Sequence, residues 1–175
     1  MITQEEISEE YVLSTAKAMA VSARTAPKAR GTDTFSILIC DKKDIETISQ
    51  QLEEDYKEFQ QEFLLRDAKN ILNADYILLI GTRIEVLGLN CGYCGFATCT
   101  DKIKEGKNVP CFFNAEDLGL AIGSAVSVAM ERRVDNRVMF SAGRAAMRAG
   151  MLQSCTQCLS VVLSAKSKNP FFDRK

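Results

Sequence analysis

The segment Tyr76-Ile77-Leu78-Leu79-Ile80-Gly81 is a run of β-favouring apolar residues closed by a glycine. A short, continuous apolar run that ends at a turn residue predicts a strand, and its lack of alternation indicates that both faces of the strand are buried. Other elements must then pack over both sides of its sheet. The segment therefore predicts a layered fold of sheet and helices.

Two further segments, on either side of this run, predict strands: residues 35–40 and residues 159–163. Between the first two strands, apolar residues recur every three or four positions, which is the pattern of an amphipathic helix that continues or bends before Ile71: Ile45, Ile48, Leu52, Tyr56, Phe59 and Phe63.

Three further helices are expected, over residues 3–24, 116–132 and 136–149. The capping-box sequence Thr3-Gln4-Glu5-Glu6 begins the first helix. Asp135 caps the last helix and Gly150 ends it. The alternation of helices and strands predicts an α+β layered sheet-and-helix domain that spans residues 1–175.

Composition excludes several classes of function. The chain has 175 residues, 46% apolar and 26% charged, with a net charge of -1 and a pI of about 5.6. This balance is typical of a globular protein and argues against nucleic acid as a main partner. The first twenty residues lack the features of a signal peptide, and no apolar run is long enough to span a membrane. We therefore expect a cytoplasmic protein without a membrane partner.

The chain contains no histidine and seven cysteines. The absence of histidine excludes Ser-His-Asp and Cys-His catalysis and every histidine-ligated metal site. No other acid–base pair or nucleophile stands out, so the sequence leaves open whether the protein is an enzyme. In a reducing compartment, clustered cysteines point to metal binding or redox chemistry.

Four of the cysteines are clustered in residues 89–113. Cys91, Cys94 and Cys99 have C-x₂-C-x₄-C spacing, and Cys111 follows eleven intervening residues later. Four cysteine thiolates are the usual ligands of iron–sulfur clusters. Gly92 and Gly95 each follow a cysteine and allow the sharp bends that a ligand loop needs. Their small size also leaves backbone N–H groups free to point at the sulfurs.

Neighbouring side chains suit a [4Fe–4S] cluster. Three lysines between the third and fourth cysteines can offset the negative charge of the cluster: Lys102, Lys104 and Lys107. Three aromatic residues can shield the cluster from water: Phe96, Phe112 and Phe113. Solvated lysines are the simpler interpretation of the first set. Three alternatives stay open. A structural zinc site usually has two close cysteine pairs, whereas this sequence has one. A plant-type [2Fe–2S] centre has C-x₄-C-x₂-C spacing, in which the two intervals are the reverse of those here, and the third alternative is unligated or redox-active thiols.

The segment Asn90-Cys91-Gly92-Tyr93-Cys94-Gly95-Phe96-Ala97-Thr98-Cys99 resembles the four-cysteine module of corrinoid iron–sulfur proteins and of the B subunit of Rnf electron-transport complexes. The resemblance implies one [4Fe–4S] cluster on Cys91, Cys94, Cys99 and Cys111, although the last interval is shorter here. Over nearly its whole length the chain also resembles a family of uncharacterised prokaryotic proteins containing a ferredoxin domain. The segments that carry this resemblance are the cysteine cluster and residues 23–31, 117–125, 134–139 and 168–174.

A second candidate site lies after the first helix, where Arg24, Lys28 and Arg30 gather around Pro27 and Gly31. The order of elements is similar to that of nitroreductase-like flavoproteins, in which the corresponding basic segment binds the flavin phosphate. The resemblance implies a nitroreductase-like topology, with an inserted cysteine-rich loop and FMN as a possible second cofactor. A solvated basic loop is the alternative.

Other motifs have simpler interpretations. Cys155 and Cys158 form a C-x-x-C pair that precedes a strand, where incidental thiols are favoured over a redox pair. Cys40 lies in an apolar strand and is expected to be a buried small hydrophobe. Four arginines at intervals of 4, 7 and 4 are expected to share one helical face, as a solvated or salt-bridging stripe or as a nucleotide contact: Arg133, Arg137, Arg144 and Arg148.

Two functions from different classes follow. The first is a redox protein whose cluster passes electrons to a partner protein, a flavin or a small substrate. The second is a non-enzymatic binding or sensor protein that a cluster or zinc stabilises. A homodimer is expected because Gly119, Gly123 and Ser127 form a small-residue face and because Pro170-Phe171-Phe172 places aromatic residues at the terminus.

Overall fold

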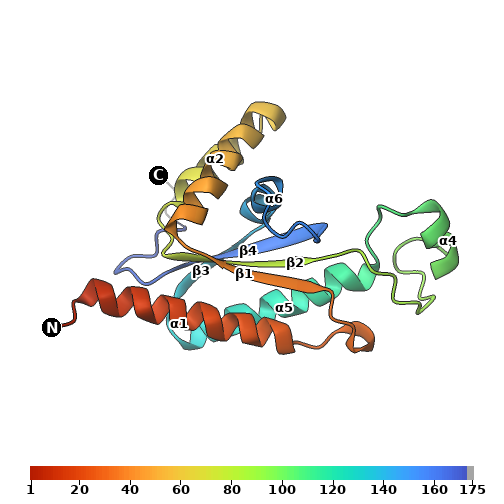
Figure 1. Ribbon diagram of the computed structural model, residues 1–175, viewed down its shortest axis with the longest axis horizontal. Helices are drawn as coiled ribbons and strands as arrows, with labels where there is room; N and C mark the ends of the chain where they lie inside the picture. Colours follow the sequence, from red (N-terminus) through yellow and green to blue (C-terminus); the bar gives the residue numbers. More distant parts are fainter. Residues whose placement is uncertain (173–175) are drawn as a thin grey trace.

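The computed structural model describes residues 1–172 and consists of a four-stranded sheet between two layers of helices (Figure 1). The strands are β1 (Phe35–Cys40), β2 (Tyr76–Thr82), β3 (Asp135–Met139) and β4 (Gln157–Ser164). Their order is β1-β2-β4-β3, and every neighbouring pair is antiparallel. The expected α+β layered class is confirmed. Of the motif at residues 168–174, Asp173 and Arg174 lie outside the described residues.

The two central strands are buried on both faces, as the apolar run predicts. Ile77 and Leu79 of β2 point into one core, whereas Leu78 and Ile80 point into the other. The strand passes Gly81, which was expected to end it, and stops at Thr82. β2 lies between β1 and β4, so both of its edges are hydrogen-bonded.

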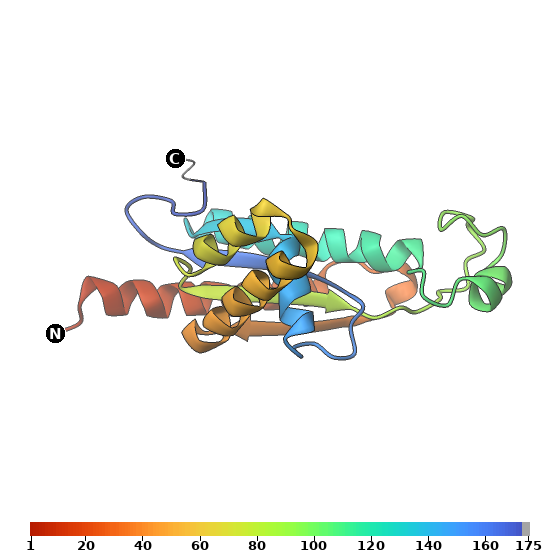
Figure 2. The ribbon, with the colours of Figure 1, turned by 90° about the horizontal axis from the view of Figure 1, so that it is seen from above.

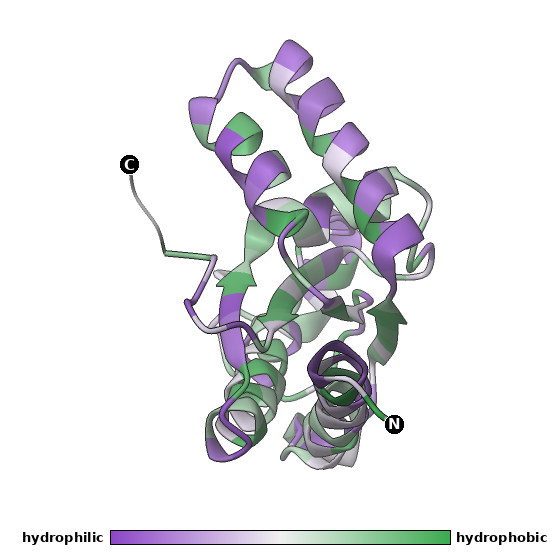
Figure 3. Cartoon of the chain, turned by 90° about the vertical axis from the view of Figure 1, so that its left-hand side faces the viewer, coloured by the Kyte–Doolittle hydropathy of each residue, from purple (hydrophilic) through white to green (hydrophobic). Residues whose placement is uncertain are grey.

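Helices α1 (Gln4–Thr25) and α5 (Phe112–Glu131) cover one face of the sheet, and α2 (Lys42–Phe59), α3 (Glu62–Ile71) and α6 (Phe140–Arg148) cover the other (Figures 1 and 2). Hydrophobic residues are concentrated on the strands between these layers, and the outer sides of the helices are largely polar (Figure 3). The hydroxyls of Ser22 and Ser124, 2.6 Å apart, connect α1 to α5.

Helix boundaries follow local chemistry where caps are present. Thr3 and Glu6 form the expected capping box of α1. Gln60 adopts a left-handed conformation (φ 54°) that ends α2, so the long amphipathic segment bends and continues as α3. No helix among residues 1–172 has the length and apolar character needed to cross a bilayer.

The C-terminal half differs from expectation at two points. Residues 136–149 form strand β3 followed by α6 instead of one helix, because Asp135–Met139 pairs with β4 along its edge. Helix α5 begins at Phe112 rather than at Glu116, since Cys111 is its N-cap. Phe171 is buried in the core and Phe172 packs against Arg137, so part of the terminal aromatic surface is covered by the chain itself.

Candidate metal centre

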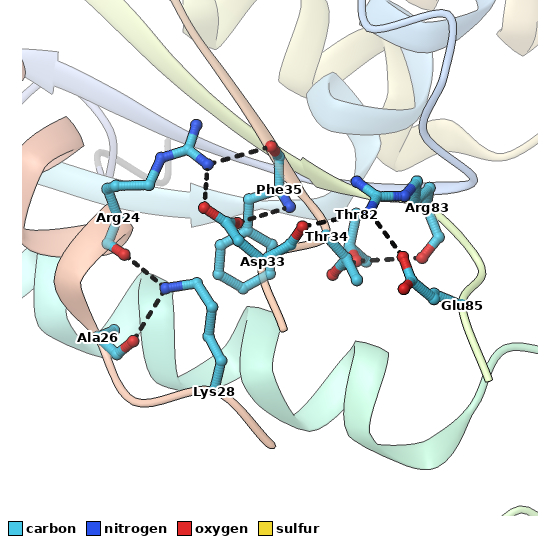
Figure 4. A network of polar contacts seen from close by, with 9 residues as sticks. All are labelled: Arg24, Ala26, Lys28, Asp33, Thr34, Phe35, Thr82, Arg83 and Glu85. Atoms are coloured by element: carbon cyan, nitrogen blue, oxygen red, sulfur yellow. Dashed lines mark hydrogen bonds and ion pairs between the residues drawn. The ribbon is translucent and has the colours of Figure 1, made fainter. Parts of the chain in front are cut away.

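The cysteine-rich segment forms a lobe, residues 83–111, that extends beyond one end of the sheet and includes the short helix α4 (Cys99–Glu105) (Figures 1 and 2). Polar contacts fix its base (Figure 4). Arg83 donates from its guanidinium to the Asp33 carbonyl at 3.2 Å and pairs with Glu85 at 2.6 Å. The Thr34 and Thr82 hydroxyls lie 2.7 Å apart beside it. The lobe is therefore anchored to the end of the β1–β2 pair.

The cysteine loop, residues 89–99, is shaped by left-handed residues. Gly92 (φ 74°) and Gly95 (φ 88°) have the positive φ angles that were expected after Cys91 and Cys94. Asn90 (φ 49°) is also left-handed. Its backbone N–H donates to the Cys99 Sγ at 3.3 Å, and its side-chain oxygen accepts from the Cys99 N–H at 2.8 Å. These two contacts close the loop at its ends.

Helix α4 presents Lys102 to the interior of the lobe. Thr98 caps the helix by accepting from the Asp101 N–H at 3.1 Å. Lys102 is only 2% exposed, whereas Lys104 and Lys107 are exposed. The interpretation of all three lysines as solvated is therefore wrong for Lys102. The Phe96 ring packs directly against Gly106, where a Cβ would meet ring carbons at 2.5 and 2.7 Å.

The fourth cysteine is held by the start of α5. Cys111 is the N-cap residue of α5. The buried Asn114 accepts from the Cys111 N–H at 3.3 Å and from the Glu85 N–H at 3.0 Å. Asn114 therefore joins the base of the lobe to the helix that carries Cys111.

All four cysteines line one cavity together with Lys102 and the aromatic residues Phe96 and Phe113. No carboxylate is among the lining residues, so the donor set consists of thiols, which suit iron–sulfur clusters, zinc and other thiophilic metals. The cavity measures about 10 Å³, and among residues 1–172 no three Cys, Asp or Glu side chains gather as ligands of a single ion. Binding of a cluster there would therefore require the cysteine loop to rearrange, as metal binding is generally coupled to local folding.

The basic loop, residues 24–31, lies beside the base of the lobe. Arg24 pairs with Asp33, and the Lys28 ammonium donates to the Ala26 carbonyl at 2.9 Å (Figure 4). Arg30 reaches the lobe itself and donates to the Leu87 carbonyl at 2.7 Å. The buried Asp117 of α5 holds the loop by accepting from the Ala29 N–H at 3.0 Å. Each of the three cations thus has a partner within the protein.

Sequence comparison identifies the family. The chain is 38% identical over 181 residues to an uncharacterised protein of Archaeoglobus fulgidus, and the match covers 99% of this chain and 97% of that protein. Residues 107–174 match a family described as uncharacterised proteins containing a ferredoxin domain. The chain belongs to this family. The resemblance to this ferredoxin-domain family, which the sequence predicted, is confirmed.

Several solved structures with a similar fold are described as FMN-bound nitroreductases or flavoproteins. A nitroreductase with bound FMN from Bacteroides fragilis superposes with a TM-score of 0.64 at 10% identity, covering 93% of this chain and 81% of that one. A putative nitroreductase in complex with FMN from Desulfovibrio desulfuricans gives a TM-score of 0.60 at 8% identity, over 93% and 78%. A BluB-like flavoprotein from Clostridium difficile gives a TM-score of 0.54 at 17% identity, and the match covers 99% of this chain and 88% of that one. At these identities the comparisons establish the nitroreductase-like fold of this ferredoxin-domain protein.

The three remaining cysteines lie outside the lobe. Burial raises the pKa of both the Cys40 and the Cys158 thiol to about 12, so both stay protonated at neutral pH and are poor metal ligands. Cys40 is the buried small hydrophobe that was expected. Cys155 packs against Gly81, and Cys158 lies inside β4 rather than before it.

The four arginines do not share a helical face, because β3 interrupts the expected helix. Arg137 lies on β3 and donates to the Phe171 carbonyl at 3.0 Å. Arg144 and Arg148 of α6 lie over the Phe59 ring and pair with the buried Asp55 of α2. These two arginines therefore connect α6 to α2.

Asn90 and Asn114 are the site residues that the sequence did not single out. Asn90 directly precedes the first cysteine, and its αL tendency was an available signal. Asn114 had no comparable signal, because its role depends on Glu85, which lies 29 positions away in the chain.

Proposed function

We propose that this ferredoxin-domain protein is an iron–sulfur redox protein that binds one [4Fe–4S] cluster through Cys91, Cys94, Cys99 and Cys111. The observation that carries the proposal is the cavity lined by these four thiols and by no carboxylate. Bound there, the cluster would supply one-electron transfer.

Other residues of the lobe are suited to that role. Phe96 and Phe113 line the cavity and limit access of water to it. On the outer side, Tyr93 is 68% exposed and lies edge-on to the Phe112 ring at 5.2 Å. An exposed aromatic surface beside a cluster provides a contact for a redox partner protein.

Anaerobic reconstitution with iron and sulfide tests the proposal. We expect stoichiometric iron and sulfide, and a broad visible absorbance that dithionite bleaches. Replacing Cys91, Cys94, Cys99 or Cys111 with serine should abolish this signal, whereas Cys155→Ser and Cys158→Ser serve as matched controls that retain it. A colourless protein that binds zinc in place of iron would favour the structural alternative, and loss of iron in the two controls would show that the ligand set is wrong.

We further propose that FMN binds with its phosphate at Arg24, Lys28 and Arg30. Two observations favour this: the fold is shared with proteins solved with FMN, and the Arg30 contact to Leu87 places the basic loop against the lobe. The Arg24–Asp33 pair is exposed, so exchanging Asp33 for a phosphate costs little.

Titration with FMN, followed by flavin fluorescence, tests this second proposal. A charge-assisted contact is worth about 1.5–3 kcal/mol, so Arg24→Ala should weaken binding about tenfold or more. Arg132→Ala, which removes a half-buried arginine just after α5, should leave the affinity unchanged. Absence of binding at tens of micromolar would identify the basic loop as solvated surface.

A further inference from the structure

Lys102 is buried in the wall of the cysteine cavity. It is 2% exposed and lies one turn of α4 after Cys99. It lines the same cavity as the four thiols. A lysine is seldom fully buried without a partner, so its position needs an electrostatic explanation.

The protein supplies no counter-charge for Lys102. Within residues 1–172, its ammonium takes part in no ion pair and no hydrogen bond to another side chain or carbonyl. The carboxylate nearest in sequence, that of Asp101, accepts from the Thr98 hydroxyl at 2.7 Å. The ammonium nitrogen is not among the fully buried, unpartnered polar atoms and so keeps some contact with water, but its charge stands in the wall of the thiol-lined cavity without a charged partner. A group of opposite charge in the cavity would therefore be attracted to Lys102.

We infer that Lys102 is the counter-charge of the group bound by the four cysteines and that it raises the reduction potential of that group. The inference rests on the proposed function. Four thiolates around a [4Fe–4S]²⁺ core carry a net negative charge, and uptake of one electron from an external donor makes that charge more negative. A fixed positive charge in a water-poor cavity stabilises the reduced form more than the oxidised form. Lys102 would act through charge and would not be a ligand.

The test compares the midpoint potentials of matched lysine variants. Lys102→Met removes the buried charge and keeps an unbranched side chain, whereas Lys104→Met removes an exposed charge from the same helix. Anaerobic redox titration with dithionite, followed by visible absorbance and EPR, gives the potential, and iron analysis gives the occupancy. We expect Lys102→Met to make reduction at least tenfold less favourable, which is about 59 mV for one electron. Lys104→Met should cause a much smaller change.

A third variant separates charge from shape. Lys102→Arg should keep both the iron content and a potential close to that of the wild type. If Lys102→Met fails to hold iron while Lys102→Arg holds it, the charge requirement is supported. An unchanged potential in an iron-loaded Lys102→Met protein would overturn the inference, as would equal loss of iron in both variants. Failure of the proposed function is distinguishable, because the wild-type protein itself would then bind no cluster.

Discussion

Asn90 holds the cysteine loop through its backbone and its side chain at once. It is left-handed, its N–H donates to the Cys99 sulfur, and its amide oxygen accepts from the Cys99 N–H. Glycine at this position would keep the left-handed backbone but lose the side-chain amide. Alanine would lose the amide and would also disfavour the left-handed backbone.

We therefore predict a graded effect at Asn90. One lost hydrogen bond is worth about 1 kcal/mol, so Asn90→Gly should release iron to a chelator about fivefold faster than the wild type. Asn90→Ala should release it faster again, because a left-handed alanine costs about 1–2 kcal/mol more. Stopped-flow or manual chelation of the reconstituted protein measures these rates. Identical rates in all three proteins would show that Asn90 does not hold the loop.

Cys40 predicts how stability depends on pH. Burial raises the pKa of its thiol from 9.0 to about 12. The folded protein therefore holds this proton more tightly than the unfolded chain does, so the contribution to stability is complete below pH 9.0 and is lost as the pH rises towards 12. Between these two pKa values, each unit of rising pH lowers the contribution of the Cys40 thiol to the free energy of unfolding by about 1.4 kcal/mol.

Cys40→Ala should remove this slope while lowering stability at neutral pH, because it leaves a small cavity. Urea unfolding from about pH 8 to about pH 11 should show the wild type and the variant converging as the pH rises. Parallel curves would mean that the Cys40 thiol is not protected from ionisation.

At the residue scale, sequence reasoning worked where a residue's role depends on its immediate neighbours. The positive φ angles of Gly92 and Gly95 and the capping box of Thr3 were predictable in this way. The burial of Lys102 was not, because it depends on Phe96 and Gly106 closing the lobe around a helix that looks polar in sequence.

At the element scale, Gly143 allows α6 to lie directly on β4. A Cβ there would stand 2.8 Å from the carbonyl carbon of Cys158, and closer to its oxygen. These atoms belong to the backbone of a paired strand and cannot move aside easily. Gly119 of α5, by contrast, has open space around the position of a Cβ.

Alanine substitutions at these two glycines should have opposite effects. Gly143→Ala should lower the free energy of unfolding by about 1–3 kcal/mol through overpacking. Gly119→Ala should leave the stability of the single folded chain unchanged or raise it by up to about 1 kcal/mol, because alanine favours a helix. Chemical denaturation of both variants measures the difference. A Gly143→Ala protein as stable as the wild type would show that α6 does not pack this closely.

Elements with strong periodicity were predictable from sequence, and short edge elements were not. The apolar runs of β1, β2 and β4 and the stripe of α2 dominate their segments. Strand β3 carries polar, half-buried residues and pairs on one edge only, so its sequence resembles the start of a helix. Its conformation is set by pairing with β4, which lies later in the chain.

At the scale of the whole molecule, contacts distant in sequence bring the two candidate sites together. Arg30 contacts Leu87 across 57 positions, and Asp117 contacts Ala29 across 88. The sequence showed a basic loop and a cysteine cluster as separate motifs. Their adjacency could not be predicted, because it results from α1 and α5 packing side by side under the sheet (Figure 1).

The exposed side of α5 has features that suit the expected homodimer. Gly119, Gly123 and Ser127 of α5 are exposed, and a Cβ at either glycine would meet no atom within 4 Å. Two exposed apolar side chains lie on the same helix, Leu120 at 44% and Met130 at 69% exposure. Small residues flanked by exposed apolar ones suit close contact with another helix. We predict that two copies of the chain pair through α5.

Light scattering and one disruptive substitution test this pairing. The wild type should have about twice the 19.4 kDa mass of the chain. Gly123→Lys places a charged side chain on the proposed contact and should give a monomer, and it should still fold because the open space around Gly123 accommodates the side chain within one copy. Gln50→Lys, on the exposed side of α2, is the matched control and should remain dimeric. A wild-type mass of one chain would rule out the dimer. A dimeric Gly123→Lys protein would place the interface elsewhere, because a buried lysine without a partner cannot be accommodated between two tightly packed helices.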